Sequence, residues 1–219
     1  MSLGKRRPML EIVLLVGAPL LLAAVEICHP HPHDLLKLDV QTWLVVHYAQ
    51  IPLFGLSGLA LAGLVRGVAG FAAAVCRVAA FVFAVGYTAF DTAAGVVTGI
   101  LVKAAHASGA PDAWRAPIDA VWTHPIMGGS PSMPTPPVLA VLGSVAWSVG
   151  AVAAAVSLKR EGRSWAPVLL LAASSFGIGI FKTHAWPGGP LTFGGMAIVA
   201  GWVLWERARE AKVGRDPQQ

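Results

Sequence analysis

Six long apolar stretches, each close to the length of a membrane span, dominate this sequence of 219 residues. A helix rises about 1.5 Å per residue, so about 20 apolar residues cross about 30 Å of hydrocarbon. The stretches are continuous and rich in Ala, Leu and Gly, whereas strands of a membrane β-barrel are shorter and alternate apolar with polar residues. The pattern predicts an all-α integral membrane protein, a six-transmembrane-helix bundle forming one polytopic domain. The predicted spans are 9–28, 40–65, 78–102, 138–158, 165–181 and 191–205.

The composition supports the same class of protein. Hydrophobic residues make up 56% of the chain and charged residues 12%, which is about half the share of about 25% that is usual in soluble domains. A water-soluble protein of this size could not cover its surface with so few charges, and the apolar content excludes intrinsic disorder. The two cysteines, Cys28 and Cys76, are predicted at opposite membrane faces, so we expect no disulfide between them.

Lys and Arg residues are unevenly distributed between the predicted loops. If the N-terminus lies inside, four basic residues fall on outer segments and twelve on inner ones, including the predicted cytoplasmic tail 206–219. Basic residues are enriched in cytoplasmic loops, so we expect a multi-pass cell-membrane protein with both termini cytoplasmic. The net charge of +5 then reflects topology, and no nucleic-acid partner is expected. The inner set is Lys5, Arg6, Arg7, Arg66, Arg77, Lys159, Arg160, Arg163, Arg207, Arg209, Lys212 and Arg215.

The outer segment 106–137, between the third and fourth spans, is unusually long and holds seven of the sixteen prolines. Loops of this length tend to be functional or disordered. Residues 112–122 are predicted to form a short amphipathic helix, because Trp114, Ile118 and Trp122 recur at intervals of four. The Gly- and Pro-rich tract that follows predicts an extended connector. The segment is either a lid over an outward-facing site or a linker with a surface anchor.

Ionisable side chains within spans are costly, because burying one in a bilayer costs about 2.5–3.5 kcal/mol on insertion scales. Glu26 lies within about one turn of the outer end of the first span, and His29 follows on the same helix face. On the second span, His47 and Gln50 are likewise three residues apart. Glu26 and His29 either belong to a functional site or form a structural pair, in which the acid is hydrogen-bonded to an imidazole at the membrane interface.

Asp91 falls near the middle of the third span, on a stripe of small and polar residues that includes Thr88. Tyr87, one turn before Asp91, is placed to donate a hydrogen bond to it. A carboxyl group at this depth is expected to be protonated or paired. We expect Asp91 to carry protons or stabilise charge, with structural pairing to Tyr87 or a threonine as the alternative.

All seven histidines fall in the outer half of the predicted topology, and His47 lies within the hydrocarbon region. Imidazole is the commonest metal ligand and titrates near neutral pH. His31 and His33 alternate along a proline-stiffened segment that continues into Asp34, an arrangement that permits a chelate for copper, zinc or nickel. A solvated polar turn is the alternative. Each of the remaining three histidines, taken alone, is expected at the surface: His106, His124 and His184. His184 lies in a tight turn that could approach the same outer end as the other histidines.

These positions favour an outward-facing pocket between the first three spans that binds or moves a transition metal or haem. Glu26, Gln50 and Asp91 would line it, with Glu26 supplying charge and orienting an imidazole ring. The histidine-rich segment would capture the ligand at the mouth. The predicted metal ligands are His29, His31, His33, Asp34 and His47.

A membrane enzyme acting on an apolar, lipid- or isoprenoid-like substrate is the alternative, for example in an acid-initiated cyclisation. Asp91, Glu26 and His47 would then be catalytic: Asp91 would donate a proton to the substrate, and Glu26 or His47 would remove a proton later. Aromatic rings would stabilise a cationic intermediate. The predicted pocket and its aromatic lining comprise His29, Gln50, Phe54, Tyr87, Thr88 and Phe90.

Two further alternatives stay open at the level of sequence. A proton-coupled transporter needs a polar route to the cytoplasm, for which the inner halves offer only Ser57, Thr98 and Glu11. An assembly subunit would use the stripes of small residues as partner faces. The sequence holds no Walker loop, nucleophile elbow, zincin motif or Cys-x-x-Cys motif, which leaves those enzyme classes without support.

Overall fold

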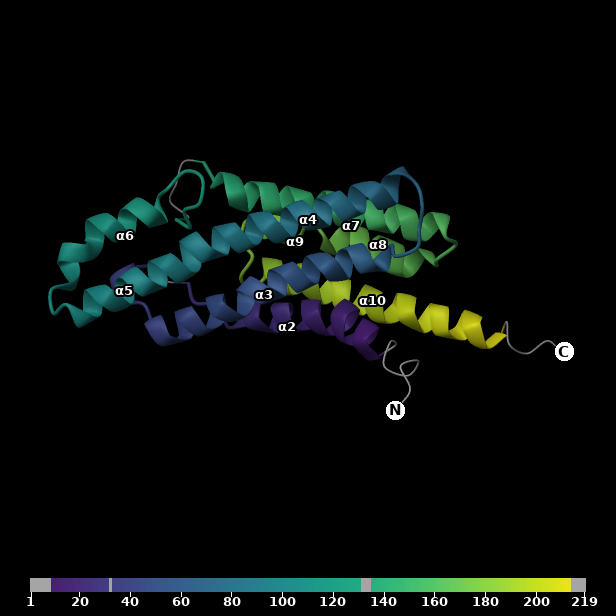
Figure 1. The fold of residues 1–219 in the computed structure, drawn as a ribbon, viewed down its shortest axis with the longest axis horizontal. Coiled ribbons are helices and arrows are strands. Elements are labelled where there is room, and N and C mark those ends of the chain that lie inside the picture. The colour runs from purple at the N-terminus through teal and green to yellow at the C-terminus, as the bar shows by residue number, and fades with distance from the viewer. Residues whose placement is uncertain (1–8, 32, 131–134, 214–219) are drawn as a thin grey trace.

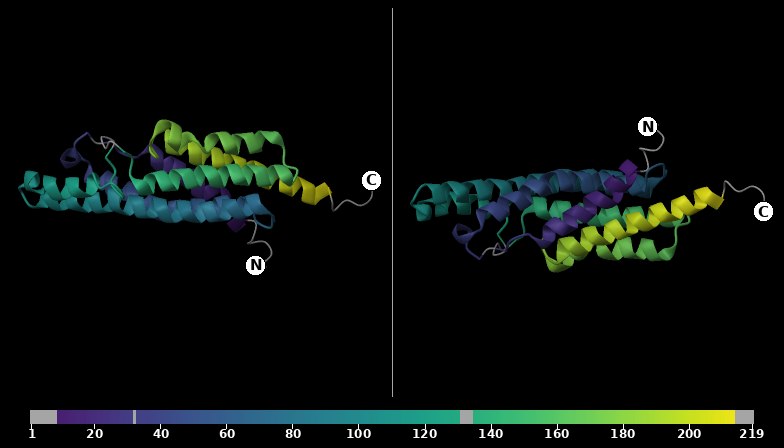
Figure 2. Two further views of the ribbon diagram at one scale, coloured as in Figure 1. Left: turned by 90° about the horizontal axis from the view of Figure 1, so that it is seen from above. Right: turned by 90° about the horizontal axis from the view of Figure 1, so that it is seen from below.

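The computed structural model describes residues 9–31, 33–130 and 135–213, and it forms a bundle of helices lying side by side (Figures 1 and 2). All regular elements in these residues are helical, which confirms the all-α part of the prediction. Five helices in the described chain are long and apolar enough to cross a membrane. They are Met9–Ile27, Val40–Leu64, Phe71–Ala107, Val138–Arg160 and Gly188–Ala211.

The elements follow one another without a strand in the described ranges. Two stretches within the long helices, η1 and η3, are π-helical, and η2 and η4 are single 3₁₀ turns. The bounds are η1 Val13–Gly17, α2 Ala18–Ile27, η2 Leu35–Lys37, α3 Val40–Leu64, α4 Phe71–Asp91, η3 Thr92–Val97, α5 Thr98–Ala107, η4 Pro111–Trp114, α6 Arg115–Trp122, α7 Val138–Arg160, α8 Trp165–Ser174, α9 Gly177–Phe181 and α10 Gly188–Val213.

The fifth predicted span, 165–181, is not confirmed. It is a shorter apolar segment, α8 followed by α9, with a break at Ser175 and Phe176. The ten residues of α8 rise only about 15 Å, half of the hydrocarbon thickness. The last helix also differs from prediction: it begins at Gly188 and continues past 205 to Val213. Arg207 helps to hold this extension, because its Nη2 donates to the carbonyl of Leu64 at 2.8 Å.

The third predicted span, 78–102, is part of a much longer helix that runs from Phe71 to Ala107 through α4, η3 and α5. Thirty-seven residues rise about 55 Å, so α5 projects beyond the rest of the bundle. The predicted amphipathic helix is confirmed as η4 and α6, which fold back along α5 (Figure 1). Its buried Ile118 joins a small apolar core with Leu38, Trp43, Leu44, Val102 and Ala105.

The main core lies between α3, α4, α7 and α10. Its centre is a group of aromatic rings in which Trp147 lies 4.6 Å from Phe83 and 5.0 Å from Phe193, centroid to centroid. Phe54 lies 6.0 Å from Phe83 and extends the group toward the end of the bundle that carries α5. Helices α2 and α10, far apart in sequence, also lie side by side (Figure 2). The interior at this level is therefore closed by packed rings.

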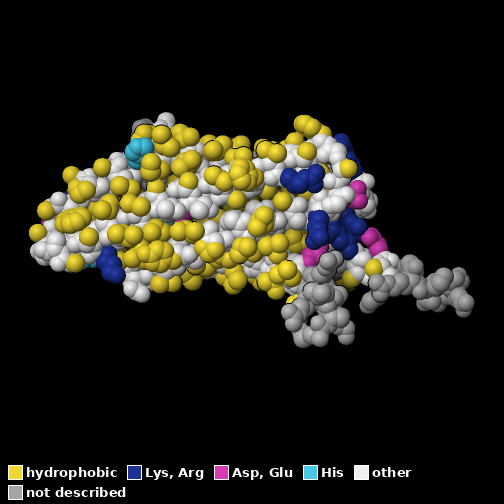
Figure 3. Space-filling model, viewed as in Figure 1, with side chains coloured by type: hydrophobic (Ala, Val, Ile, Leu, Met, Phe, Trp, Pro, Cys, Tyr) yellow, Lys and Arg dark blue, Asp and Glu magenta, His cyan; other side chains and the backbone are white. Residues whose placement is uncertain are grey.

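Charged residues gather at the end of the bundle where α2 begins and α10 ends, and most of the remaining surface is apolar (Figure 3). Arg163 pairs there with Glu210 at 2.6 Å, and Arg207 pairs with Glu11 at 3.9 Å. We call this the basic end. Lys5, Arg6, Arg7 and Arg215 lie outside the described residues. Cys28 and Cys76 are free thiols, as predicted.

Candidate functional site

Five ionisable side chains from separate parts of the chain meet inside the bundle. Glu26 lies near the end of α2, and His29 follows in the turn after that helix. The ring of His29 lies 4.9 Å from the rings of both His47, from α3, and His184, from the loop before α10. Asp91, the last residue of α4, faces His47. We call Glu26, His29, His47, Asp91 and His184 the His–acid cluster; the predicted meeting of the first four is present.

The cluster is withdrawn from solvent. Glu26, Asp91 and His47 have 0%, 1% and 2% of their surfaces exposed, and His29 and His184 are partly buried. Burying ionised groups in an apolar interior costs several kcal/mol each unless they are paired or bind an ion. A group of two acids and three imidazoles at this depth therefore needs compensating partners.

Two imidazoles are held with a defined nitrogen protonated. Nδ1 of His29 lies 2.8 Å from the carbonyl oxygen of Pro30, and Nδ1 of His47 lies 2.7 Å from that of Trp43. A carbonyl oxygen can only accept, so Nδ1 carries the proton in both rings. In the neutral ring Nε2 is then an unprotonated nitrogen with a free lone pair. Nε2 of His29 is buried and has no hydrogen-bond partner in the described chain.

Nδ1 of His184 likewise lies close to an oxygen atom, at 3.1 Å from Oε2 of Glu26. His29 and His184 lie outside the membrane-spanning helices, and burial lowers the pKa of each imidazole, to about 3 for His29 and about 4 for His184. Neighbouring imidazoles lower both further. Both rings are therefore neutral at physiological pH, which is the form that binds metal ions.

The acids contribute several oxygen atoms without partners. Oδ1 of Asp91 lies 3.8 Å from Nε2 of His47, beyond hydrogen-bond distance. Within the described chain, Oδ2 of Asp91, Oε1 of Glu26 and both amide atoms of Gln50 are buried without a hydrogen-bond partner. With both acids ionised, these oxygens and Nε2 of His29 form a group of acceptors, and the Gln50 amide nitrogen is a donor. An unsatisfied buried polar atom costs about 1–3 kcal/mol, so these groups need partners beyond the described contacts.

Close helix packing positions His47. A side chain at Gly95, in the π-helical segment η3, would overlap the His47 ring, so only glycine leaves room for it. The Gly95 carbonyl accepts a 2.7 Å hydrogen bond from Nε1 of Trp43, whose ring lies 4.2 Å from that of His47. Trp43 is 2% exposed, because α5 and α6 extend over it.

The predicted aromatic pocket residues surround His184. The ring of Tyr87 lies 5.9 Å from that of His184, and the rings of Phe54 and Phe90 lie 6.2 and 5.9 Å from it. The predicted hydrogen bond from Tyr87 to Asp91 is absent from the described contacts, because the Tyr87 hydroxyl pairs with Ser144 of α7 at 2.9 Å.

The positions of Tyr87 and Thr88, beside the cluster, are explained by local contacts. Gly143 leaves room for the ring of Tyr87, since a Cβ there would overlap it, and the ring therefore reaches α7. Thr88 is half-buried, and its carbonyl accepts from the hydroxyl of Thr92 within the same helix.

The predicted metal-capturing segment divides into two parts. His31 is exposed, and its ring lies 5.8 Å from that of His29, so it lies beside the cluster. His33 is exposed, and Asp34 pairs instead with Arg115 of α6 at 3.3 Å and accepts from the backbone N–H of Leu36. These hydrogen bonds hold the pKa of the Asp34 carboxyl below its usual range. Pro32 lies outside the described residues.

The Asp34–Arg115 pair is expected to fasten the segment before α3 to α6. Because the pKa of Asp34 is lowered, the pair forms at neutral pH and is lost as the pH falls below the ordinary range of aspartate. Arg115→Ala should therefore speed amide hydrogen exchange in residues 35–38 at neutral pH, and much less at low pH. Lys103→Ala, at the same end of the molecule, is the control. Equal exchange in the Arg115 variant and the wild type would contradict the assignment.

His184 is the cluster residue that sequence reasoning assigned to the surface. The only feature of the sequence that pointed to a role for His184 was the tight turn before the last span. In the structure this turn folds inward, and Gly189 packs against Glu26 and the carbonyl of His184. His106 and His124 instead serve local structure. Nε2 of His106 donates to the carbonyl of Leu36, and Nδ1 of His124 accepts from the N–H of Ile126.

The cluster is not already arranged as a coordination shell: no three His, Cys, Asp or Glu side chains in the described chain are disposed to hold a metal ion without adjustment. Comparison with known protein families, with curated proteins and with solved structures finds no match to this chain.

Proposed function

We propose that this protein binds a divalent transition-metal ion in the His–acid cluster. The observation that carries the proposal is that three imidazoles from separate elements turn Nδ1 toward an oxygen atom, and that Nε2 of His29 is buried without a hydrogen-bond partner in the described chain. A metal-bound histidine characteristically donates its other ring N–H to a carbonyl or carboxylate, which fixes the tautomer. Imidazole with carboxylate suits zinc, copper, nickel or iron.

The separations are compatible with a shared ion after modest side-chain rotation. Two imidazoles bound through Nε2 to one tetrahedral ion have centroids about 5 Å apart, given metal–nitrogen bonds of about 2.0–2.1 Å. His29 lies 4.9 Å from both His47 and His184. The 3.8 Å between His47 Nε2 and Asp91 Oδ1 is shorter than the sum of two metal–ligand bonds, about 4.2 Å.

Charge supports a divalent ion. The three imidazoles are neutral ligands, and Glu26 and Asp91 together supply two negative charges when ionised. The loaded site would therefore carry no net charge, which is the condition under which buried ions cost least. An ion is favoured over haem, because the His29 ring contacts the rings of His47 and His184 edge to face and leaves no slot for a macrocycle between them.

The surroundings favour holding an ion over moving it across the membrane. Exposed His31 next to His29 offers an approach from one side. On the other side, Phe54, Phe83 and Trp147 pack into the aromatic core and close the interior. A transporter would need an opening through these rings.

Acid–base chemistry on an apolar substrate would use the same Asp91 and Glu26. The rings expected to enclose such a substrate contact one another instead, with centroids of Phe54 and Tyr87 4.9 Å apart and those of Tyr87 and Phe90 5.9 Å apart. They fill the volume that a lipid-like substrate would occupy. We therefore rank ion binding above this activity.

We infer that the basic end of the bundle faces the cytoplasm, with α2 beginning and α10 ending there. The positive-inside bias supports this orientation, which places the His–acid cluster in the outer half. In this arrangement 165–181 enters the membrane as a broken segment, α8 and α9, and completes the six passes. Cysteine labelling at Arg66 and Lys103 from the two sides of sealed membranes would test the orientation.

The function is tested by loading the purified full-length chain separately with Co²⁺, Zn²⁺ and Cu²⁺ and measuring bound metal after gel filtration. We expect about one ion per chain for at least one metal, and a d–d spectrum typical of nitrogen and oxygen ligands with Co²⁺. His124→Ala, which removes a histidine outside the cluster, should load like the wild type. Failure of all three metals to bind the wild type would overturn the proposal.

A further inference from the structure

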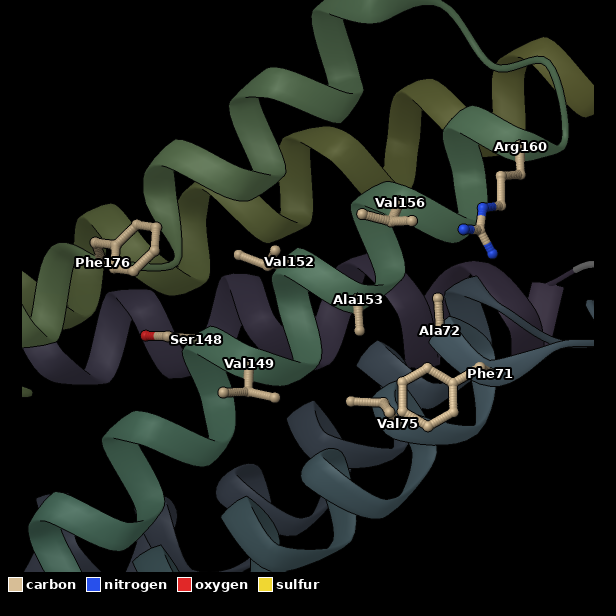
Figure 4. A pocket seen from close by; sticks show the side chains of 10 residues that line it. All are labelled: Phe71, Ala72, Val75, Ser148, Val149, Val152, Ala153, Val156, Arg160 and Phe176. Atoms are coloured by element: carbon tan, nitrogen blue, oxygen red, sulfur yellow. The ribbon is translucent and has the colours of Figure 1, made fainter.

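An apolar groove of about 480 Å³ lies on the outside of the bundle, far from the His–acid cluster (Figure 4). Phe71 and Val75 of α4 form one wall, Val152 and Val156 of α7 form another, and Phe176 closes the end nearer mid-bundle. The hydroxyl of Ser148 lines it too but donates to the carbonyl of Ser175 at 2.9 Å, so its hydrogen bond is already made. The walls therefore offer hydrocarbon contacts.

Arg160 supplies a charged group at the other end of the groove, at the basic end of the bundle (Figure 4). It is exposed, and within the described chain it forms no ion pair or side-chain hydrogen bond. Its neighbour Lys159 differs, because its ammonium group lies over the Trp165 ring and donates to the carbonyl of Arg163. Arg160 is thus available to an anion, and a guanidinium binds phosphate oxygens in pairs.

The dimensions fit a single hydrocarbon chain. From Ser148 to Arg160 the groove follows about 18 Å of α7, close to the thickness of one leaflet, about 15 Å. The volume spread over that length leaves a width of about 6 Å, too narrow for a helix, which is about 10–12 Å across. A single acyl chain therefore fills the groove, whereas a partner helix or a second copy of this chain would lie only across its mouth.

We propose that this groove binds one acyl chain of an anionic phospholipid, with the lipid phosphate at Arg160. Apolar walls take up the chain, and the unpaired guanidinium at the headgroup level selects negative charge. The site is independent of metal binding. The site would hold an anionic lipid between α4, α7 and α8, in the leaflet at the basic end of the bundle.

The test is to reconstitute the purified full-length chain in a detergent mixture containing equal amounts of phosphatidylglycerol and phosphatidylcholine and to measure retained lipid by native mass spectrometry. We expect one phosphatidylglycerol per chain, retained in preference to phosphatidylcholine. Arg160→Gln should reduce that preference roughly tenfold, as expected for loss of a charge-assisted phosphate contact. Arg66→Gln, an exposed arginine at the same end outside the groove, should leave it unchanged.

A second pair of variants tests the acyl chain separately from the headgroup. Val156→Trp fills the groove at a position that is 40% exposed, so the variant should fold and lose both lipids. Val145→Trp, at another exposed position of α7 outside the groove, is the matched control. Equal retention of the two lipids by the wild type, equal effects of Arg66→Gln and Arg160→Gln, unchanged retention in Val156→Trp, or a lipid-free dimer would each overturn the proposal.

Discussion

His47→Ala is expected to weaken metal binding by at least about 100-fold. Loss of a residue that merely orients a ligand typically costs about 10–100-fold in metal affinity, and His47 is proposed to be a ligand itself. The substitution also leaves Asp91, which lies 3.8 Å from His47, without its imidazole neighbour. Affinity is measured by competition with a chelating indicator dye on the purified protein, using the metal that loads the wild type best.

Two controls separate loss of a ligand from loss of structure. His124→Ala should bind with wild-type affinity, and His47→Ala should keep its helical circular dichroism and elute as the wild type does. His29→Ala combined with His47→Ala should leave little binding to measure. Wild-type affinity in His47→Ala, or an equal loss in His124→Ala, would contradict the proposed ligand set.

Gly95→Ala is expected to destabilise the fold by about 1–3 kcal/mol and to displace the His47 ring. The new Cβ would overlap ring atoms of His47, which is buried and tied by Nδ1 to the carbonyl of Trp43, so the ring cannot move without losing that bond. Thermal unfolding in detergent, followed by circular dichroism, measures the loss of stability. Metal affinity should fall with it.

Gly55→Ala is the matched control for this prediction. Gly55 lies in α3, as His47 does, and no atom lies within 4 Å of the position its Cβ would take. Alanine is a better helix former than glycine by up to about 1 kcal/mol, so this variant should be as stable as the wild type or slightly more stable. If Gly95→Ala unfolds at the same temperature as Gly55→Ala, the close approach of η3 to His47 is not a constraint.

Much of the fold follows from the sequence because the bilayer imposes simple requirements. Continuous apolar runs predicted helices around 9–28, 40–65 and 138–158, and the structure has helices there. Local periodicity likewise predicted the helix that contains Ile118. The third helix is longer than predicted at both ends, because Arg77 and Lys103 bound the apolar run and the burial of Ala105 against α3 and α6 gives no local signal.

The candidate site was predicted in part for the same reason. Glu26, His47 and Asp91 stand out because an ionisable residue in an apolar run needs an explanation. His184 gives no such signal, since it lies in a polar turn where a histidine is ordinary. Its place beside Glu26 depends on α2 and α10 lying together, a contact between residues 158 positions apart in the sequence.

The chain by itself determined that it is helical and apolar enough for a bilayer. Too few charged residues exist to cover it in water, and every backbone group in lipid needs a partner within its own helix. Only the tertiary structure decided which polar side chains share a site. Helix packing rotates Tyr87 toward Ser144 and away from Asp91, buries Trp43 beneath α5 and α6, and joins His184 to His29. Those outcomes depend on which helix faces touch, and that is set by glycines such as Gly95 and Gly143, where backbones approach closely enough for a ring to fill the space.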